Sequence, residues 1–201
     1  MMKEKSSGVL MHISSLPSEY GIGTMGVEAR KFVDFLEAAG QSYWQMLPIC
    51  PTSYGDSPYQ SFSTYAGNLY FIDLDLLCEQ GLLFPEEYKE RDWGNDPKQV
   101  DYGKIYESRY PVLRKAAERF AEQIPESYET FCRNNAYWLD DYALFMALKE
   151  VHDGKPWQEW EPELRNRDKK VLDLVLLQYM KKIQFWKIMQ YLFFEQWKAL
   201  R

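Results

Sequence analysis

Two nearly continuous apolar runs, separated by one amphipathic helix pattern, constrain this chain most strongly. The runs are residues 8–13 (Gly-Val-Leu-Met-His-Ile) and residues 43–49 (Tyr-Trp-Gln-Met-Leu-Pro-Ile). Short apolar runs bounded by turn residues are typical of strands that are buried on both faces. Between them, residues 27–39 place apolar side chains on one stripe, and Gly40 follows where a left-handed cap belongs. The pattern predicts one βαβ unit, with parallel pairing and a right-handed crossover.

The rest of the chain has a different character. Residues 69–77 predict a short extended segment that leads into a helix, and the sequence beyond Gly81 is helical and strongly charged. Helical periodicity covers 102–123, 128–150 and 169–201, with breaks at Pro125 and at 152–156. Two parallel strands leave two unpaired edges and do not make a stable sheet alone. We therefore expect that further sequence or another copy completes the sheet, or that the strand interpretation is wrong.

Composition excludes several classes of function. The 201 residues include 30 acidic and 24 basic side chains, a formal charge of −6, which argues against nucleic acid as a partner. No apolar run approaches the ~18 residues of a membrane span, so we expect no membrane association. Three cysteines (Cys50, Cys78 and Cys132) without zinc-like spacing indicate reduced thiols and a cytoplasmic location. His12 and His152 are too far apart in sequence to suggest a metal site.

The loops that follow the two apolar runs are the predicted functional face, because loops at the carboxyl ends of parallel strands carry the sites of α/β proteins. The second loop, residues 50–68, mixes aromatic rings with short polar side chains. Aromatic rings can cover the apolar faces of sugars, and short polar groups can bind the hydroxyls at their edges. A carbohydrate is thus one interpretation, and a surface loop that packs on neighbouring helices is the other. The mixed residues are Tyr54, Tyr59, Phe62 and Tyr65 with Asp56, Ser57, Gln60, Ser61 and Ser63.

Other candidates for chemistry are weaker. The Gly-x-Gly-x-x-Gly pattern at 21–26 does not follow its strand closely enough to form the tight turn that a dinucleotide requires. His12 is predicted to be a hydrogen-bonded histidine of the interior or the rim. We assign no catalytic residue.

Several segments identify a resemblance. The chain is similar to the 4-alpha-glucanotransferase family (amylomaltase, or disproportionating enzyme), and the block Tyr-Gly-Asp-Ser-Pro-Tyr-Gln-Ser-Phe-Ser is its most specific feature. The similar segments are residues 7–12, 15–17, 20–23, 43–48, 54–63, 66–68, 100–103 and 190–197.

The resemblance implies an α/β fold, the start of a TIM (β/α)8 barrel with about two strands and a large, mostly helical insertion. A complete barrel needs eight strands and about 250 residues, so the barrel is expected to be incomplete in this chain and the chain to be an N-terminal fragment. We expect residues 1–75 to form the N-terminal part of the catalytic barrel. Residues 76–201 are expected to form the helical insertion subdomain and the helix that leads to the next strand.

The resemblance also implies retaining transfer of α-1,4-glucan segments to an acceptor glucose or maltooligosaccharide. The catalytic carboxylates of the family lie on later strands, so none is assigned here, and the chain alone is expected to be inactive. The chemistry implies neither a metal nor another cofactor. The alternatives are a non-catalytic glucan-binding module and a helical interaction protein, and a fragment with open strand edges is also expected to self-associate.

The same resemblance implies the residues that bind substrate. Ser57 and Tyr59 are expected at the sugar near the point of cleavage, with Asp56 and Gln60 supporting the loop. Tyr54 and Tyr102 resemble the aromatic pair of a second glucan-binding groove. For Tyr102 the alternative is a helix-start residue that packs on the insertion.

Overall fold

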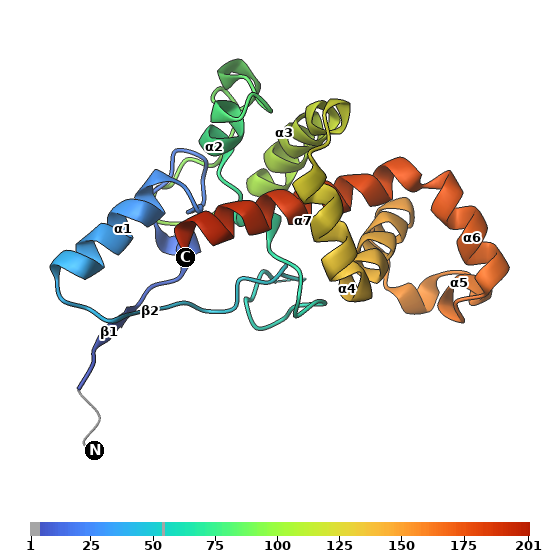
Figure 1. Ribbon diagram of the computed structural model, residues 1–201, viewed down its shortest axis with the longest axis horizontal. Coiled ribbons are helices and arrows are strands. Elements are labelled where there is room, and N and C mark those ends of the chain that lie inside the picture. Colours follow the sequence, from blue (N-terminus) through green and yellow to red (C-terminus); the bar gives the residue numbers. More distant parts are fainter. Residues whose placement is uncertain (1–4, 54) are drawn as a thin grey trace.

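The computed structural model describes residues 5–53 and 55–201, in which two short parallel strands accompany a mostly helical chain (Figure 1). Strand β1 (Gly8–Leu10) pairs with β2 (Tyr43–Gln45) in parallel, with Gly8 opposite Tyr43, and helix α1 (Val27–Ala38) connects them. The predicted βαβ unit is therefore confirmed. Tyr54 lies outside the described residues.

Helix α1 ends where its sequence indicates. Gly40 follows the helix with φ of 66°, a left-handed conformation that glycine adopts without steric cost, and its N–H donates to the carbonyl of Glu37 at 2.9 Å. The apolar stripe is only partly covered, since Ala29 and Leu36 are buried while Val33 is exposed. Two three-residue strands cannot cover the whole stripe of a twelve-residue helix.

Both strands are shorter and more exposed than their apolar runs predict. Leu10 in β1 and Tyr43 in β2 are exposed by 56% and 63%, so the expected burial on both faces is wrong for the described chain. Beyond β1 the backbone turns into a 3-10 helix, η1 (Ile13–Ser15), which ends the extended run. The pattern of hydrophobicity located the strands correctly, but a two-stranded sheet supplies no neighbours on its outer edges.

The extended segment expected within residues 69–77 is instead a 3-10 helix, η2 (Leu69–Phe71), followed by helix α2 (Leu74–Glu79). Two side-chain caps explain this geometry. The Asn68 side chain accepts a hydrogen bond from the N–H of Tyr70 at 3.0 Å, and the Asp73 side chain accepts one from the N–H of Leu76 at 2.9 Å. Local caps of this kind compete with an extended backbone.

The predicted helices are present, with one correction. The pattern at 169–201 forms two helices and not one, because the chain turns at Tyr179, where no proline or glycine marks a break. Pro111 lies inside an unbroken helix. The remaining elements are η3 (Pro85–Glu87), α3 (Tyr102–Glu122), α4 (Glu126–Val151), η4 (Trp157–Glu159), α5 (Pro162–Arg165), α6 (Lys169–Gln178) and α7 (Met180–Leu200).

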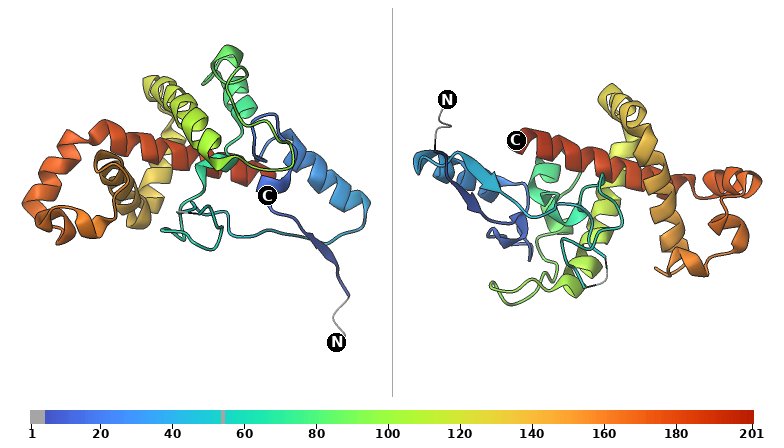
Figure 2. Two further views of the ribbon diagram at one scale, coloured as in Figure 1. Left: turned by 180° about the vertical axis from the view of Figure 1, so that it is seen from behind. Right: turned by 90° about the horizontal axis from the view of Figure 1, so that it is seen from below.

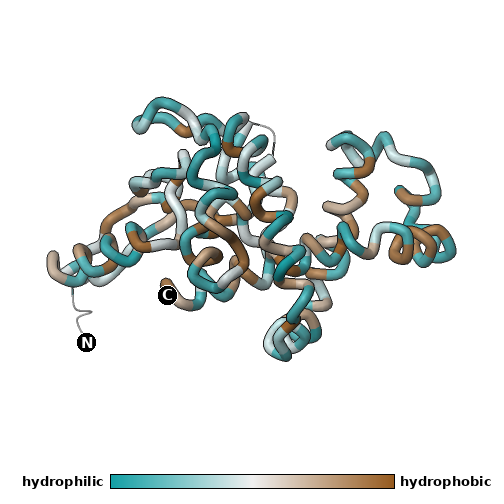
Figure 3. The backbone as a smooth tube through the Cα atoms, turned by 90° about the horizontal axis from the view of Figure 1, so that it is seen from above, coloured by the Kyte–Doolittle hydropathy of each residue, from teal (hydrophilic) through white to brown (hydrophobic). Residues whose placement is uncertain are grey.

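Helix α7 packs against both the helical part and the N-terminal part of the chain. It packs against α4 and α3, contacts η2, and runs from α6 back to the N-terminal segments (Figures 1 and 2). One buried cluster extends from Ile13 to Phe193, whereas the segment with α5 and α6 extends away from the main body, with apolar and polar residues interspersed along it (Figure 3). Among the described residues, no helix combines the length and hydrophobicity needed to cross a bilayer.

A buried arginine fastens α3 to the segment that follows the second loop. Arg109 is fully buried and donates to the carbonyl of Leu69 at 3.3 Å and to the carbonyl of Ile72. Burial lowers the pKa of Arg109 to about 10, so the guanidinium still carries its proton at neutral pH. The base of the second loop is therefore held by a charged side chain that donates to backbone carbonyls.

Candidate functional site

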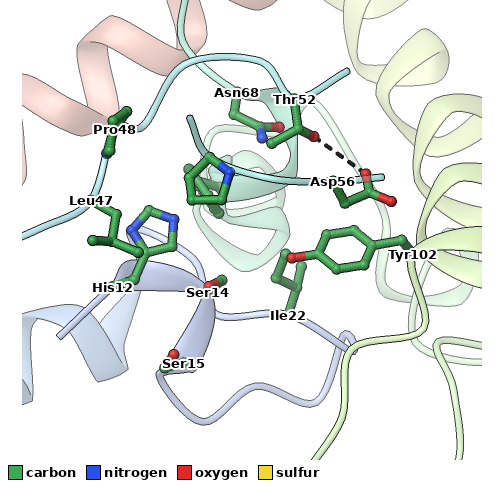
Figure 4. Close-up of a pocket in the computed structure, with 12 residues that line it drawn as sticks. His12, Ser14, Ser15, Ile22, Leu47, Pro48, Thr52, Asp56, Asn68 and Tyr102 are labelled. Carbon is green, nitrogen blue, oxygen red and sulfur yellow. Dashed lines mark hydrogen bonds between the residues drawn. The ribbon is translucent and has the colours of Figure 1, made fainter. Parts of the chain in front are cut away.

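The segments that leave the carboxyl ends of β1 and β2 form one wall of a cavity of about 160 Å³, and the first turn of α3 closes its other side (Figure 4). This is the edge of a parallel sheet where loops of α/β proteins carry their sites. The polar residues that line it come from three parts of the chain. They are His12, Ser14 and Ser15 after β1, Thr52, Asp56 and Asn68 after β2, and Tyr102 on α3.

Asp56 and Tyr102 face the same cavity, although 45 residues separate them in the sequence (Figure 4). Asp56 adopts a φ of 54°, which is uncommon for a residue with a side chain, and Thr52 Oγ1 donates to its Oδ1 at 3.3 Å. Burial, followed by the charge of Asp56, raises the pKa of Tyr102 above its ordinary value. Tyr102 therefore remains a neutral phenol that can donate or accept a hydrogen bond.

The second loop is closed by its own backbone. The N–H of Ser53 donates to the carbonyl of Gln60 at 3.0 Å, and the N–H of Gln60 donates to the carbonyl of Ser57 at 3.0 Å. The N–H of Asp56 donates to the carbonyl of Ser53 at 3.1 Å. These bonds lie within the loop, and its aromatic side chains add contacts with α4, where Phe62 meets Phe145 and Tyr65 meets Trp138. The loop thus holds Asp56 at the cavity and leaves the Tyr59 side chain 73% exposed.

The residues implied by the resemblance divide into two groups. Asp56 and Tyr102 line the cavity, while Ser57, Tyr59 and Gln60 lie on the same loop but are not among the lining residues. Ser57 is half-buried, and Gln60 is exposed.

His12, which the sequence interpretation left out of the site, lines the cavity just after β1. Its ring stands edge-on to Phe71, with centroids 5.3 Å apart, and burial lowers its pKa, so the ring is neutral near pH 7. Its Nδ1 atom is buried and has no hydrogen-bond partner within residues 5–53 and 55–201. Its position near the carboxyl end of the predicted strand, residues 8–13, was the signal that could have identified it.

Thr52 and Asn68 were also missed as site residues. Thr52 supports the Asp56 carboxylate, and Asn68 caps η2 with its side chain while its N–H donates to the carbonyl of Ile49 at 2.9 Å. Both residues are ordinary loop residues by composition, so only their tertiary position identifies them.

The chemistry of the cavity follows from its lining. Asp56 is its single carboxylate, and no lysine or arginine lines it within the described part of the chain. Hydroxyls, an amide, a neutral imidazole and aromatic rings suit an uncharged ligand with many hydroxyl groups. No group of three histidine, cysteine or acidic side chains that could hold a metal ion is found within the residues that the structure describes.

Fold and cavity together define a mostly helical α/β chain with one parallel βαβ unit and a site suited to polyhydroxylated ligands. Residues 11–201 match the family described as 4-alpha-glucanotransferase, and the chain belongs to that family.

Individual relatives agree with this assignment. A 4-alpha-glucanotransferase of Streptococcus pneumoniae is 49% identical over 202 residues, which cover 100% of this chain and 40% of the relative. One from Thermus thermophilus is 46% identical over 98% of this chain and 39% of its own length. The chain thus spans about 40% of the length of the curated relatives that it matches.

Solved structures give the fold. The amylomaltase from Streptococcus agalactiae in complex with acarbose superposes with a TM-score of 0.94 at 42% identity, over 98% of this chain and 40% of that one. The fold is therefore the partial amylomaltase barrel, mostly helical with two parallel strands. The amylomaltase from Corynebacterium glutamicum, at 20% identity and a TM-score of 0.68, supports the fold alone.

Proposed function

We propose that this chain supplies glucan-binding loops to a 4-alpha-glucanotransferase, which transfers α-1,4-glucan segments to glucose or a maltooligosaccharide with retention of configuration. The observation that carries the proposal is the cavity at the strand ends, lined by Asp56 and Tyr102, in a chain that belongs to this family. The acarbose bound to the Streptococcus agalactiae relative, a structure covering 98% of this chain, supports a maltooligosaccharide as the ligand.

The proposed roles of the loop residues follow from their exposure. Tyr59, at 73% exposure, offers an open aromatic face to a sugar ring, with the Ser57 hydroxyl two residues before it. Asp56 and Gln60 support the loop and its contacts. Tyr102, together with Tyr54 outside the described residues, forms the proposed second glucan contact.

Retaining transfer uses one carboxylate as nucleophile and a second carboxyl group as acid, about 5–5.5 Å apart. Among the described residues that line the cavity, Asp56 is the single carboxylate, so this chain lacks the required pair there. We therefore propose that it binds glucan but does not catalyse transfer by itself.

The proposed division of the chain assigns residues 1–75 to the barrel and residues 76–201 to a helical insertion with its lead-in helix. A cytoplasmic location belongs to the same proposal. A non-catalytic glucan-binding module is the second candidate, and the single cavity carboxylate favours it.

The proposed lack of transfer activity is tested by incubating the 201-residue chain with maltotriose and separating the products by chromatography. We expect no maltodextrins longer than the substrate. Formation of longer products would refute the assignment of catalysis to residues outside this chain.

Glucan binding is tested by calorimetry with maltoheptaose. We expect Tyr59→Ala and Tyr102→Ala each to weaken binding about 10-fold, since stacking of one aromatic ring contributes about 1–1.5 kcal/mol. Tyr43→Ala is the matched control, because Tyr43 on β2 is 63% exposed and does not line the cavity. Absence of binding by the unmodified chain, or equal effects of all three variants, would reject the proposed site.

A further inference from the structure

A second, smaller cavity lies behind the wall of the first. It has a volume of about 30 Å³ and is lined by the second loop, η2 and three helices. Tyr110 of α3, Tyr142 of α4 and Trp186 of α7 line it from the helical side. On the loop side, Thr52 and Asn68 line both this cavity and the larger one, so these two residues form the wall that the cavities share.

Two of the residues that line this cavity each carry a buried polar atom without a hydrogen-bond partner among the described residues. These atoms are Tyr142 Oη and Trp186 Nε1, whose residues are 7% and 4% exposed, and the two ring centroids lie 6.3 Å apart. Burial raises the pKa of Tyr142 well above its ordinary value, so its hydroxyl remains protonated. A buried indole N–H and a buried phenol without partners are unfavourable unless a small polar guest binds them.

The volume of the cavity determines which ligand it can hold. The cavity volume of about 30 Å³ is too small for a sugar ring, but it exceeds the roughly 10–15 Å³ of cavity volume that one water requires. Water can accept from Trp186 and exchange a hydrogen bond with Tyr142. Its remaining hydrogen bonds are available to the polar side chains of the shared wall.

We infer that this cavity is a hydration site that holds one or two ordered waters, and that Tyr142 and Trp186 are positioning residues for the glucan-binding cavity. The waters link the two helices to the wall that Thr52 and Asn68 form. Thr52 in turn donates to Asp56, so the helical part of the chain controls where the Asp56 carboxylate lies. The part of this inference that concerns glucan affinity rests on the proposed function.

The direct test is a high-resolution crystal structure of the chain. We expect an ordered water within hydrogen-bond distance of both Tyr142 Oη and Trp186 Nε1. A dry cavity, or rotated side chains that pair with other protein atoms, would overturn the inference.

The positioning role is tested with Tyr142→Phe. We expect faster amide hydrogen exchange at Thr52 and Asp56, without a matching change elsewhere, and maltoheptaose binding weaker by about 3- to 10-fold. Tyr191→Phe is the control, because it removes a buried tyrosine hydroxyl that pairs with Ser127 at 2.8 Å and does not line the cavity. Uniform changes in exchange, or equal effects of both variants, would overturn the positioning role.

If the unmodified chain does not bind maltoheptaose, the proposed function fails, while the crystallographic and exchange measurements still decide this inference.

Discussion

Glu87 shows how single charged side chains stabilise the helical part of this chain. It lies in η3 and accepts two hydrogen bonds from Arg119 at 2.7 and 2.8 Å, while Lys115 Nζ lies 3.2 Å away. The Glu87 side chain is 10% exposed. The Arg119 hydrogen bonds, with smaller contributions from the N–H of Phe84 and from Lys115, hold the pKa of Glu87 at about 2.

We expect Glu87→Gln to lower the free energy of unfolding by about 1–2 kcal/mol at pH 7, because charge-assisted hydrogen bonds to Arg119 are lost. The carboxylate stabilises the fold above its ordinary pKa of 4.5, and this contribution disappears as the pH falls toward about 2. The difference between variant and unmodified chain should therefore shrink between those values. Urea unfolding at several pH values measures it.

Glu86→Gln is the control for this experiment, because Glu86 is the exposed neighbour in the same 3-10 helix. A loss of stability in Glu86→Gln as large as in Glu87→Gln would contradict the assigned role of the Arg119 pair.

At the scale of elements, two glutamines of α7 hold the segment from the end of the second loop to the start of α2. Gln190 accepts from the N–H of Gly67 at 2.7 Å and donates to its carbonyl at 3.0 Å. Gln196 makes the same pair with Asp73, at 2.7 and 3.1 Å. Both glutamines are buried, so their side chains pair backbone groups of Gly67 and Asp73 that would otherwise be buried without partners.

Close packing accompanies these bonds. A Cβ atom at Gly67 would lie 2.1 Å from the ring of Phe193 on α7, so only glycine allows this approach. The segment and the helix are therefore fitted to each other by shape as well as by hydrogen bonds.

We expect Gln190→Leu to lower the free energy of unfolding by about 2–4 kcal/mol, because the buried N–H and carbonyl of Gly67 both lose their partner. Chemical unfolding followed by circular dichroism measures the change. Glu195→Gln, at an exposed position of the same helix, should change stability little. Equal effects of the two substitutions would show that the paired amide does not hold the segment.

At the scale of the whole molecule, the described chain leaves apolar surface around its two-stranded sheet. Leu10, Phe35 and Tyr43 are exposed by 56%, 59% and 63%, and each strand pairs on one side alone within the described residues. Open strand edges with apolar side chains favour association with another chain.

We expect the chain to self-associate with increasing concentration, as measured by sedimentation velocity, and Leu10→Lys to weaken this association by placing a charge at the strand. Leu177→Lys is the control, because Leu177 on α6 is 76% exposed but lies away from the sheet. A monomer at all concentrations, or equal effects of both substitutions, would contradict the role of the sheet.

How much of the fold was predictable differs between elements. The βαβ unit, α3 and α4 follow from hydrophobic periodicity and from breaks such as Pro125, which act over a few neighbouring residues. The turn at Tyr179 and the 3-10 helix at Leu69–Phe71 were not predicted. At Leu69–Phe71, the short-range cap of Asn68 decides between conformations that periodicity does not distinguish.

The candidate site was predictable only in part. Its aromatic loop and the resemblance indicated Asp56 and Tyr102, but not His12 or Thr52, and Tyr59 proved to lie outside the cavity lining.

The sequence by itself determined the family, the parallel βαβ unit and the helical character of the rest, because these depend on residue types and their spacing along the chain. Tertiary structure alone decided which side chains meet at the cavity, that α7 supplies Gln190 and Gln196 to the backbone of Gly67 and Asp73, and that a second cavity lies behind Thr52. Such contacts join residues distant in sequence, and they depend on how whole helices pack, which no local pattern encodes.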